Sequence, residues 1–316
     1  ITLYRMASHS QIVEALCDAA ENGKEVLALV ELRARFDEAS NIEMSRRLED
    51  AGCQVIYGLP SYKVHSKLCL VTRQTAEGVH FLTQIGTGNY NEKTATLYTD
   101  LSLITANQNI GRDAQEVFRT LLLGETVEKS TDLLVAPRGL QEAILEKIRK
   151  EGRKAEEGRG GYIGLKLNAL TDKDIIDALI EASEKGAVIQ LLIRGICCLI
   201  PGISGKTDHI TVHSVVGRYL EHSRIYRFGQ GDAEEIYIAS ADFMTRNTLR
   251  RVEVAAPIYD EENRNRVREI FDLGFRDTEK GKVLLADGLY HDPENPGDER
   301  FDSQDFFYRE AYKSVE

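Results

Sequence analysis

The feature that most constrains the fold of this chain is an internal repeat, in which four short features recur in the same order. They are a glycine followed by an apolar run (Gly23 with 26–30, Gly186 with 189–193), the strings YKVHSK at 62–67 and YLEHSR at 219–224, the strings IGTGNY at 85–90 and IASADF at 238–243, and the acids Asp100 and Glu253. Their spacing drifts only from 163 to 153 residues, which differences in loop length explain. A repeat of this kind predicts two domains of similar fold.

Helical and strand-like segments alternate in both halves of the chain. Ser8 is expected to cap a helix that Gly23 ends, and Asp172 to cap a helix that Gly186 ends, each followed by a buried strand at 26–30 or 188–193. Further strands are expected at 55–57, 67–72, 79–85, 101–105, 165–170, 210–216, 224–228, 235–239 and 252–256, further helices at 38–51, 112–123, 138–150 and 260–276, and a surface loop at 151–161. The pattern predicts an α/β fold class, with one domain at residues 1–132 and a second at 133–316.

Charge and composition exclude several functions. The net charge of −11 argues against a general nucleic-acid binder, although a local basic pocket for an anion remains compatible with it. No apolar run approaches the roughly 20 residues of a membrane helix. The five cysteines are irregularly spaced, which argues against a disulfide framework or a zinc site and favours a reducing, cytoplasmic location. Because the chain opens on Ile1 without a signal-peptide pattern, we expect it to be a fragment of a longer protein.

The repeat supplies one His-Ser-basic tripeptide in each half, at 65–67 and at 222–224. If each tripeptide begins a strand, His65 and Lys67 share one face, and so do His222 and Arg224. An imidazole beside a cation suits attack on a phosphate, since the cation neutralises the oxygens while the ring attacks or moves a proton. His65 is the better candidate nucleophile because Lys63 and Lys67 flank it.

Small residues in tight turns follow each tripeptide, at 87–89 and at 240–242. Glycine at 88 is expected to allow close backbone approach to an anion, and Asn89 to supply a polar side chain nearby. The remaining histidines, at 9, 80, 209, 213 and 291, lack this context and are predicted to be structural or solvated.

Two such H-x-K/R strings, each followed by a small-residue turn with Asn or Asp, resemble the phospholipase D superfamily. That family pairs two histidines across a pseudo-two-fold axis and forms a phosphohistidine on one of them. The resemblance implies two tandem phospholipase D-like domains. The aspartate that the superfamily places seven residues after each histidine is absent, because Thr72 and Gly229 stand there. This departure argues against phosphodiester hydrolysis.

A narrower resemblance covers roughly residues 1–278. The strings that carry it are TLYR at 2–5, VELRARFDE at 30–38, KVHSK at 63–67, IGTGNYNEKTA at 85–95, LYTD at 97–100, LIRGIC at 192–197, RYLEHSR at 218–224 and SADFMTRN at 240–247. They resemble the bacterial polyphosphate kinases of the first type, which reversibly build inorganic polyphosphate from ATP through a phosphohistidine. The resemblance covers the catalytic C-terminal half only, without the family's N-terminal and head domains.

The resemblance implies roles for individual residues. His65 matches the phosphorylated histidine and His222 the second active-site histidine. Arg5, Arg35 and Arg194 match phosphate-binding positions, and Tyr98 matches a nucleotide-contacting tyrosine. We further expect Lys67, Asn89 and Arg224 to bind phosphate or nucleotide.

The resemblance also implies a cofactor and partners. Mg²⁺ is expected to enter with ATP and to lie near Arg5 and Arg35 through the substrate phosphates, because guanidinium groups cannot ligate a metal. The partners implied are ATP or ADP and inorganic polyphosphate, with no nucleic acid and no integral membrane segment, and the full-length protein is expected to be a homo-oligomer.

Two alternatives remain beside the kinase: a phosphodiesterase of the phospholipase D type, and a fragment that binds phosphate without turnover. Acid-labile label retained from the γ-phosphate of ATP would favour the kinase. Cleavage of a lipid or nucleic acid would favour the phosphodiesterase, and binding without transfer would favour the third hypothesis.

Overall fold

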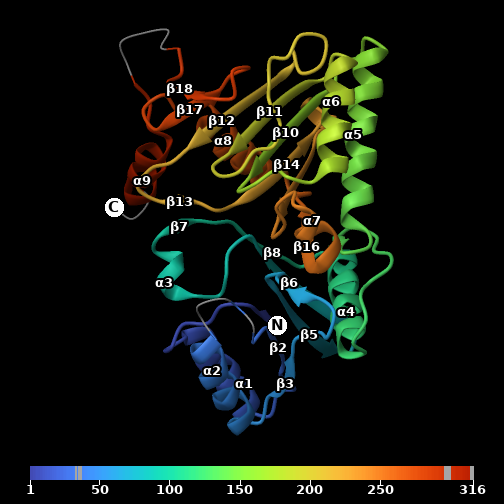
Figure 1. Ribbon diagram of the computed structural model, residues 1–316. Coiled ribbons are helices and arrows are strands. Elements are labelled where there is room, and N and C mark those ends of the chain that lie inside the picture. The colour runs from blue at the N-terminus through green and yellow to red at the C-terminus, as the bar shows by residue number, and fades with distance from the viewer. Residues whose placement is uncertain (33, 35–37, 295–299, 314–316) are drawn as a thin grey trace. The chain divides into compact units, whose positions relative to one another are not determined.

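The computed structural model describes residues 1–32, 34, 38–294 and 300–313 (Figure 1). The chain divides into two compact units, of which the first holds residues 1–141, 239–241 and 246–256 and the second holds 142–238, 242–245 and 257–316. The first unit therefore includes two short segments of the second sequence repeat. The domain boundary expected between 132 and 133 stays a prediction.

One layer of the first unit is a parallel sheet. Its strands lie in the order β1 (Thr2–Leu3), β2 (Leu27–Val30) and β3 (Gln54–Tyr57). The helices α1 (Gln11–Glu21) and α2 (Glu38–Asp50) provide the crossovers that parallel strands require. Apolar side chains from strands and helices close a core that includes Leu3, Val13, Val30, Met44 and Leu48.

A second sheet of the first unit is antiparallel, in the order β5 (Leu68–Thr75), β6 (Gly78–Gly86) and β8 (Ser102–Thr105). The helix α4 (Gln108–Leu122) packs against β5 and β6, and the short elements α3 (Glu92–Ala95) and β7 (Tyr98–Thr99) lie between β6 and β8 in sequence. The strand β16 (Arg251–Pro257) pairs in parallel with β4 (Lys63–Val64) and antiparallel with β9 (Leu134–Ala136). The segment just before His65 is thus held by a strand from the second repeat.

The second unit is built on one large sheet. Its strands run β18 (Tyr290–His291), β17 (Gly281–Leu284), β12 (Ile210–Val215), β11 (Val188–Ile193), β10 (Tyr162–Leu167), β14 (Arg224–Phe228) and β15 (Glu235–Ala239). The strands β10, β11 and β12 are parallel, and β14 joins β10 antiparallel. Helices of this unit include α5 (Leu140–Glu156), α6 (Lys173–Glu184), α8 (Glu261–Phe275) and α9 (Ser303–Lys313). The short elements β13 (Leu220–Glu221) and η1 (Gly231–Ala233) also belong to this unit. The short helix α7 (Thr245–Arg250) belongs to the first unit, apart from Thr245.

The element order bears out the sequence repeat. The parallel trio β1-β2-β3, with α1 between its first two strands, corresponds to β10-β11-β12 with α6. The later series β5, β6, β8, α4 corresponds in chain order to β14, β15, β16, α8. The fold class expected from the sequence, two related α/β halves, is confirmed.

Two local predictions are wrong. The cap of α1 is Ser10, whose hydroxyl accepts from the Val13 N–H at 3.4 Å, because a capping residue must directly precede the first helical residue. The expected loop at 151–161 is helical as far as Glu156, since Glu151 is buried and accepts from Lys154 at 2.6 Å.

Within the described ranges, no helix is both long and apolar enough to cross a membrane.

Candidate active site

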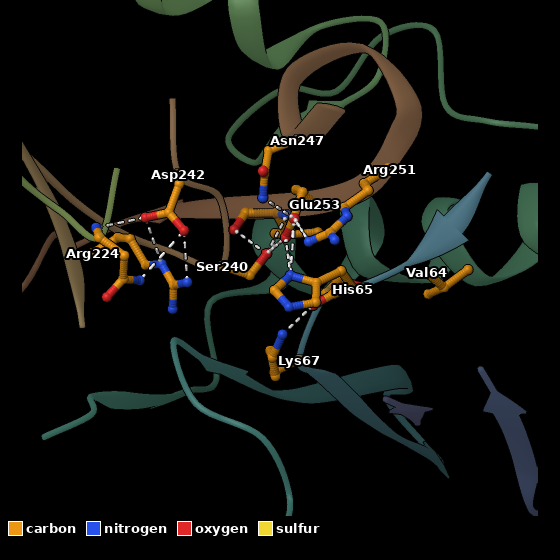
Figure 2. A network of polar contacts seen from close by, with 12 residues as sticks. Val64, His65, Lys67, Arg224, Ser240, Asp242, Asn247, Arg251 and Glu253 are labelled. Carbon is orange, nitrogen blue, oxygen red and sulfur yellow. Dashed lines mark hydrogen bonds and ion pairs between the residues drawn. The ribbon is translucent and has the colours of Figure 1, made fainter. Parts of the chain in front are cut away.

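The imidazole of His65 is fixed in the first unit by its backbone and its ring. His65 follows β4, and the N–H groups of His65 and Ser66 both donate to the Val252 carbonyl at 2.9 Å. The His65 side chain is 11% exposed, and its Nδ1 lies 2.9 Å and 3.0 Å from the two carboxylate oxygens of Glu253 (Figure 2). A carboxylate only accepts, so Nδ1 carries a ring proton, and in the neutral imidazole the lone pair lies on Nε2.

Glu253 is fully buried, and further donors hold its orientation. The Ser240 hydroxyl donates to one carboxylate oxygen at 2.5 Å, and the Asn247 amide donates to the other at 2.8 Å. The Arg251 guanidinium lies 4.0 Å away. A carboxylate held in this way fixes both the tautomer and the orientation of the His65 ring.

Lys67 and Tyr4 lie against the same histidine. Lys67 is 1% exposed, and its ammonium donates to the His65 carbonyl and lies 5.3 Å from the centre of the Tyr4 ring. The Tyr4 ring meets the His65 ring edge-on, with centroids 4.6 Å apart. The Thr2 hydroxyl donates to the Ser66 carbonyl at 2.9 Å and accepts from the Leu68 N–H at 3.0 Å. Strand β1 and Tyr4 together therefore contact residues 65–68.

The expectation that 65–67 begins a strand is wrong, because β5 begins at Leu68 and residues 65–67 lie between two strands. The same holds for His222 and Ser223, which precede β14. Each basic side chain lies near its histidine because it folds back and donates to the backbone carbonyl of that histidine. Lys67 reaches the carbonyl of His65, and Arg224 reaches the carbonyl of His222 at 2.8 Å.

The turn at 87–89, which contains Gly88, is hydrogen-bonded to a carboxylate of the protein itself, that of Asp100. The Thr87 hydroxyl donates to the Asp100 carboxylate at 2.7 Å, as Ser240 does to Glu253 in the second repeat. A Cβ at position 88 would lie 2.2 Å from an Asp100 oxygen, so glycine is required for this approach. Gly88 therefore allows the Asp100 carboxylate to approach closely, and the approach of a substrate anion to this turn stays a prediction.

Two further predicted residues line a cavity of about 630 Å³ in the first unit. Asn89 and Tyr98 lie on its wall, together with Asp100, Gln84 and Cys69. The Oδ1 atom of Asn89 is buried and has no hydrogen-bond partner among the described residues. Arg5 is half-buried, with its guanidinium 5.9 Å from the centre of the Tyr4 ring, while Arg35 lies outside the described residues.

The second unit holds a cluster of polar side chains around His222. Arg224 donates from Nε and Nη2 to Asp242 at 3.2 Å and 2.9 Å, and its Nη1 lies 3.3 Å from the His222 Nε2 (Figure 2). Burial alone would raise the pKa of Asp242, but the charge and hydrogen bonds of Arg224, with help from Asn168, lower it to about 2. Arg194 joins the cluster by donating to the Asn168 Oδ1 at 2.6 Å. The structure thus brings together His222, Arg224 and Arg194.

Sequence reasoning missed three residues of these clusters: Glu253, Asn168 and Tyr4. The repeat had matched Glu253 with Asp100, which was the available signal, but it gave neither acid a role. Asn168 directly follows β10, at the carboxyl edge where α/β sheets collect polar groups. Tyr4 stood inside the string TLYR, where only Arg5 had been assigned a role.

Comparison with known proteins places these clusters in a family. Residues 1–127 match the family model "Polyphosphate kinase C-terminal domain 1", and residues 133–304 match "Polyphosphate kinase C-terminal domain 2". The chain is 46% identical over 312 residues to a polyphosphate kinase of Staphylococcus epidermidis, covering 99% of this chain and 42% of the relative. It is 44% identical over 315 residues to that of Bacillus anthracis, covering 100% and 45%.

The fold agrees with a solved structure. The crystal structure of polyphosphate kinase from Porphyromonas gingivalis superposes with a TM-score of 0.90 at 37% identity, covering 99% of this chain and 48% of that chain. The tandem α/β halves are therefore those of polyphosphate kinase C-terminal domains. The chain belongs to the polyphosphate kinase family and spans less than half the length of these relatives.

Proposed function

We propose that this chain carries the phosphotransfer chemistry of a polyphosphate kinase, which moves the γ-phosphoryl group of ATP to His65 and then to inorganic polyphosphate. The observation that carries the proposal is the His65–Glu253 pair, with Nδ1 2.9 Å from the carboxylate. It presents Nε2 as the nucleophile at a site only slightly open to solvent. Family membership supports the choice of substrates.

The proposed reaction has two steps, and both take place at Nε2 of His65. The Nε2 lone pair attacks the γ-phosphorus, an N–P bond forms, and the bond from that phosphorus to the β–γ bridging oxygen breaks, with its electron pair leaving on ADP. A terminal phosphate oxygen of polyphosphate then attacks the phosphorus, and the N–P electron pair returns to Nε2. The reverse sequence makes ATP. Glu253 accepts the hydrogen bond from Nδ1–H throughout, and its negative charge offsets the positive charge that the ring gains.

Cations in each unit are suited to the phosphate oxygens. In the first unit we assign Lys67 and Arg5 to this role, and in the second Arg194 and Arg224. His222, beside Arg224, is proposed to hold the transferring group or to move a proton. Asn89 and Tyr98 are proposed to contact nucleotide, because they line the cavity of the first unit.

Mg²⁺ belongs to this proposal as part of the substrate MgATP. The described residues place no three carboxylate, imidazole or thiol groups in a metal-ligating cluster. This fits an ion that keeps phosphate and water oxygens as its ligands. Arg5 would then share the phosphate oxygens with the ion. We also propose a cytoplasmic location and a homo-oligomeric full-length protein, as the family resemblance implies.

The test is retention of label from ATP that carries radioactive phosphorus at the γ position. The chain is expected to take up acid-labile, base-stable label, and His65→Ala is expected to abolish it. His80→Ala is the matched control, because His80 is an exposed histidine of the same unit. Equal labelling of the His65→Ala variant would contradict the assignment, and cleavage of a phosphodiester without labelling would favour the phospholipase D alternative.

A further inference from the structure

The side chain of Gln304, from the C-terminal helix α9, is bonded to the segment that precedes His222. Gln304 is 6% exposed. Its Oε1 accepts from the Tyr219 N–H at 2.9 Å, and its Nε2 donates to the Tyr219 carbonyl at 2.9 Å and to Glu221 at 2.7 Å. One amide group therefore satisfies both backbone groups of Tyr219 and one oxygen of Glu221, in the region of Figure 1 where α9 lies beside β13.

The approach of Gln304 to this segment requires a glycine. A Cβ at Gly217 would lie 2.6 Å from the Gln304 Oε1. Real Cβ atoms essentially never approach that closely, so any larger residue at 217 would displace the amide from Tyr219. The hydrogen bonds of the Gln304 amide therefore depend on glycine at position 217.

The hydrogen bonds continue on both sides of His222. The Lys166 ammonium lies 2.8 Å from the other oxygen of Glu221 and donates to the Ser223 hydroxyl at 2.8 Å. Lys166 is 3% exposed, so this link is shielded from water. Glu221 and Ser223 are the neighbours of His222 in sequence. Lys166 therefore contacts the residues on both sides of the histidine, while Gln304 contacts the segment before it.

The position of Gln304 is itself fixed by a buried aspartate. Asp277, at 1% exposure, accepts from the Ser303 N–H at 2.7 Å and the Ser303 hydroxyl at 2.6 Å. It also accepts from the N–H groups of Lys280 and Gly281 at 2.7 Å and 3.0 Å. The first turn of α9 is thus joined to the end of α8, and Gln304 has little freedom to move.

We propose that Gln304 is a positioning residue for His222 and that α9 acts in phosphotransfer through it. The amide holds residues 219–221 so that the imidazole of His222 keeps its place beside Arg224. The inference rests on the proposed function for its effect on catalysis, but its effect on the His222 ring is measurable without turnover. In this proposal Gln304 acts on His222 through Tyr219 and Glu221.

The first experiment follows the ring itself. Histidine side chains labelled with carbon-13 report their surroundings by NMR, and His222→Gln and His65→Gln assign the two signals. Gln304→Leu, which removes all three hydrogen bonds at similar volume, is expected to move or broaden the His222 signal and to leave the His65 signal in place. Glu310→Gln is the matched control, because it removes an exposed contact with Arg266 from the same helix.

The second experiment separates the half-reactions. In Gln304→Leu, we expect labelling of the protein from ATP to stay within about twofold of the unsubstituted chain. We expect kcat for polyphosphate synthesis to fall by roughly 10- to 100-fold, the cost of a displaced catalytic group, with little change in KM for ATP. Where Gln304→Leu does not fold, Gly217→Ala displaces the same amide from the opposite side and takes its place.

The outcomes separate the two proposals. An unsubstituted chain that takes up no label contradicts the proposed function, while the NMR result still decides the role of Gln304. An unchanged His222 signal and unchanged kcat in Gln304→Leu and Gly217→Ala would overturn the positioning role. Equal shifts of the His65 and His222 signals would also overturn it, because they indicate a general loss of structure.

Discussion

Replacement of Glu253 by glutamine isolates the charge of the carboxylate that faces His65. The substitution keeps the size of the side chain and removes one negative charge. Asn247 can accommodate it, because the Oδ1 of its amide is buried and has no hydrogen-bond partner among the described residues. Rotation of the Asn247 amide by half a turn turns its donor into an acceptor for the new NH₂ group. An amide oxygen then still accepts the hydrogen bond from Nδ1–H of His65.

The expected loss is therefore mainly electrostatic. The imidazole gains positive charge as the N–P bond forms, and the carboxylate at 2.9 Å offsets it. Two unit charges with centres about 4 Å apart interact by about 4 kcal/mol at an effective dielectric constant of about 20. Only part of the charge has developed in the transition state, so the loss should be about 2–4 kcal/mol. This corresponds to a roughly 30- to 1000-fold slower phosphorylation of His65.

The assay is the rate at which label from the γ-phosphate of ATP enters the protein, measured before turnover. Stability is followed in parallel by thermal unfolding, where exchange of charged for neutral hydrogen bonds should cost about 1–3 kcal/mol. Glu151→Gln is the control, since Glu151 is also a buried, paired carboxylate, with Lys154 at 2.6 Å, but lies in the second unit. It should lose stability and keep its labelling rate. A labelling rate in Glu253→Gln within threefold of the unsubstituted chain would refute the electrostatic argument.

Three further predictions concern the other clusters. Asp242 has a pKa of about 2 in the folded protein, below its ordinary 3.8, so its pairing stabilises the fold above about pH 4 and this contribution is lost as the pH falls towards 2. Asp242→Asn should cost about 2 kcal/mol at pH 7 and flatten the pH dependence of unfolding over that range; an unaltered pH profile would count against the pairing. Gly88→Ala should lower the melting temperature because its Cβ would lie 2.2 Å from Asp100, and the loss should shrink in an Asp100→Ala background, whereas strictly additive losses would exclude the clash. Arg194→Lys should weaken polyphosphate binding at low salt, since an ammonium cannot reproduce the guanidinium fork; equal affinity would remove Arg194 from the phosphate site.

The sequence predicted the parts of the fold that depend on local pattern. The apolar run 188–193 became a strand, and Asp172 caps α6 as expected, by accepting from the Ile175 N–H at 3.3 Å. Predictions based on composition did less well. The charged segment 151–156 suggested a loop, yet it continues α5 because Glu151 is buried and Gly152 packs against Ala182. Charge along a segment indicates exposure on average and gives no information about which neighbours will cover it.

The candidate site was predictable to the extent that the repeat marked it. The two histidines and their basic neighbours stand out because they recur. The contact between His65 and Glu253 joins residues 188 positions apart, and no local pattern indicates which acid will meet which ring. Gln304 stands outside the repeat altogether. Its role depends on where α9 docks, which Asp277 fixes through hydrogen bonds that composition does not reveal.

The two halves share one set of hydrogen bonds but differ in the charge of a neighbouring residue. Thr87 donates to Asp100 in the first half as Ser240 donates to Glu253 in the second, at 2.7 Å and 2.5 Å. The Thr87 N–H also bonds the Leu101 carbonyl as the Ser240 N–H bonds that of Val254. Two positions further on, the halves differ, because Asn89 stands where the second half has Asp242. The second half thus sets a carboxylate with a pKa of about 2 against Arg224, while the first places a neutral amide at the matching position. At this one position the first half, which holds the proposed nucleophile, has a neutral amide, and the second half has a carboxylate.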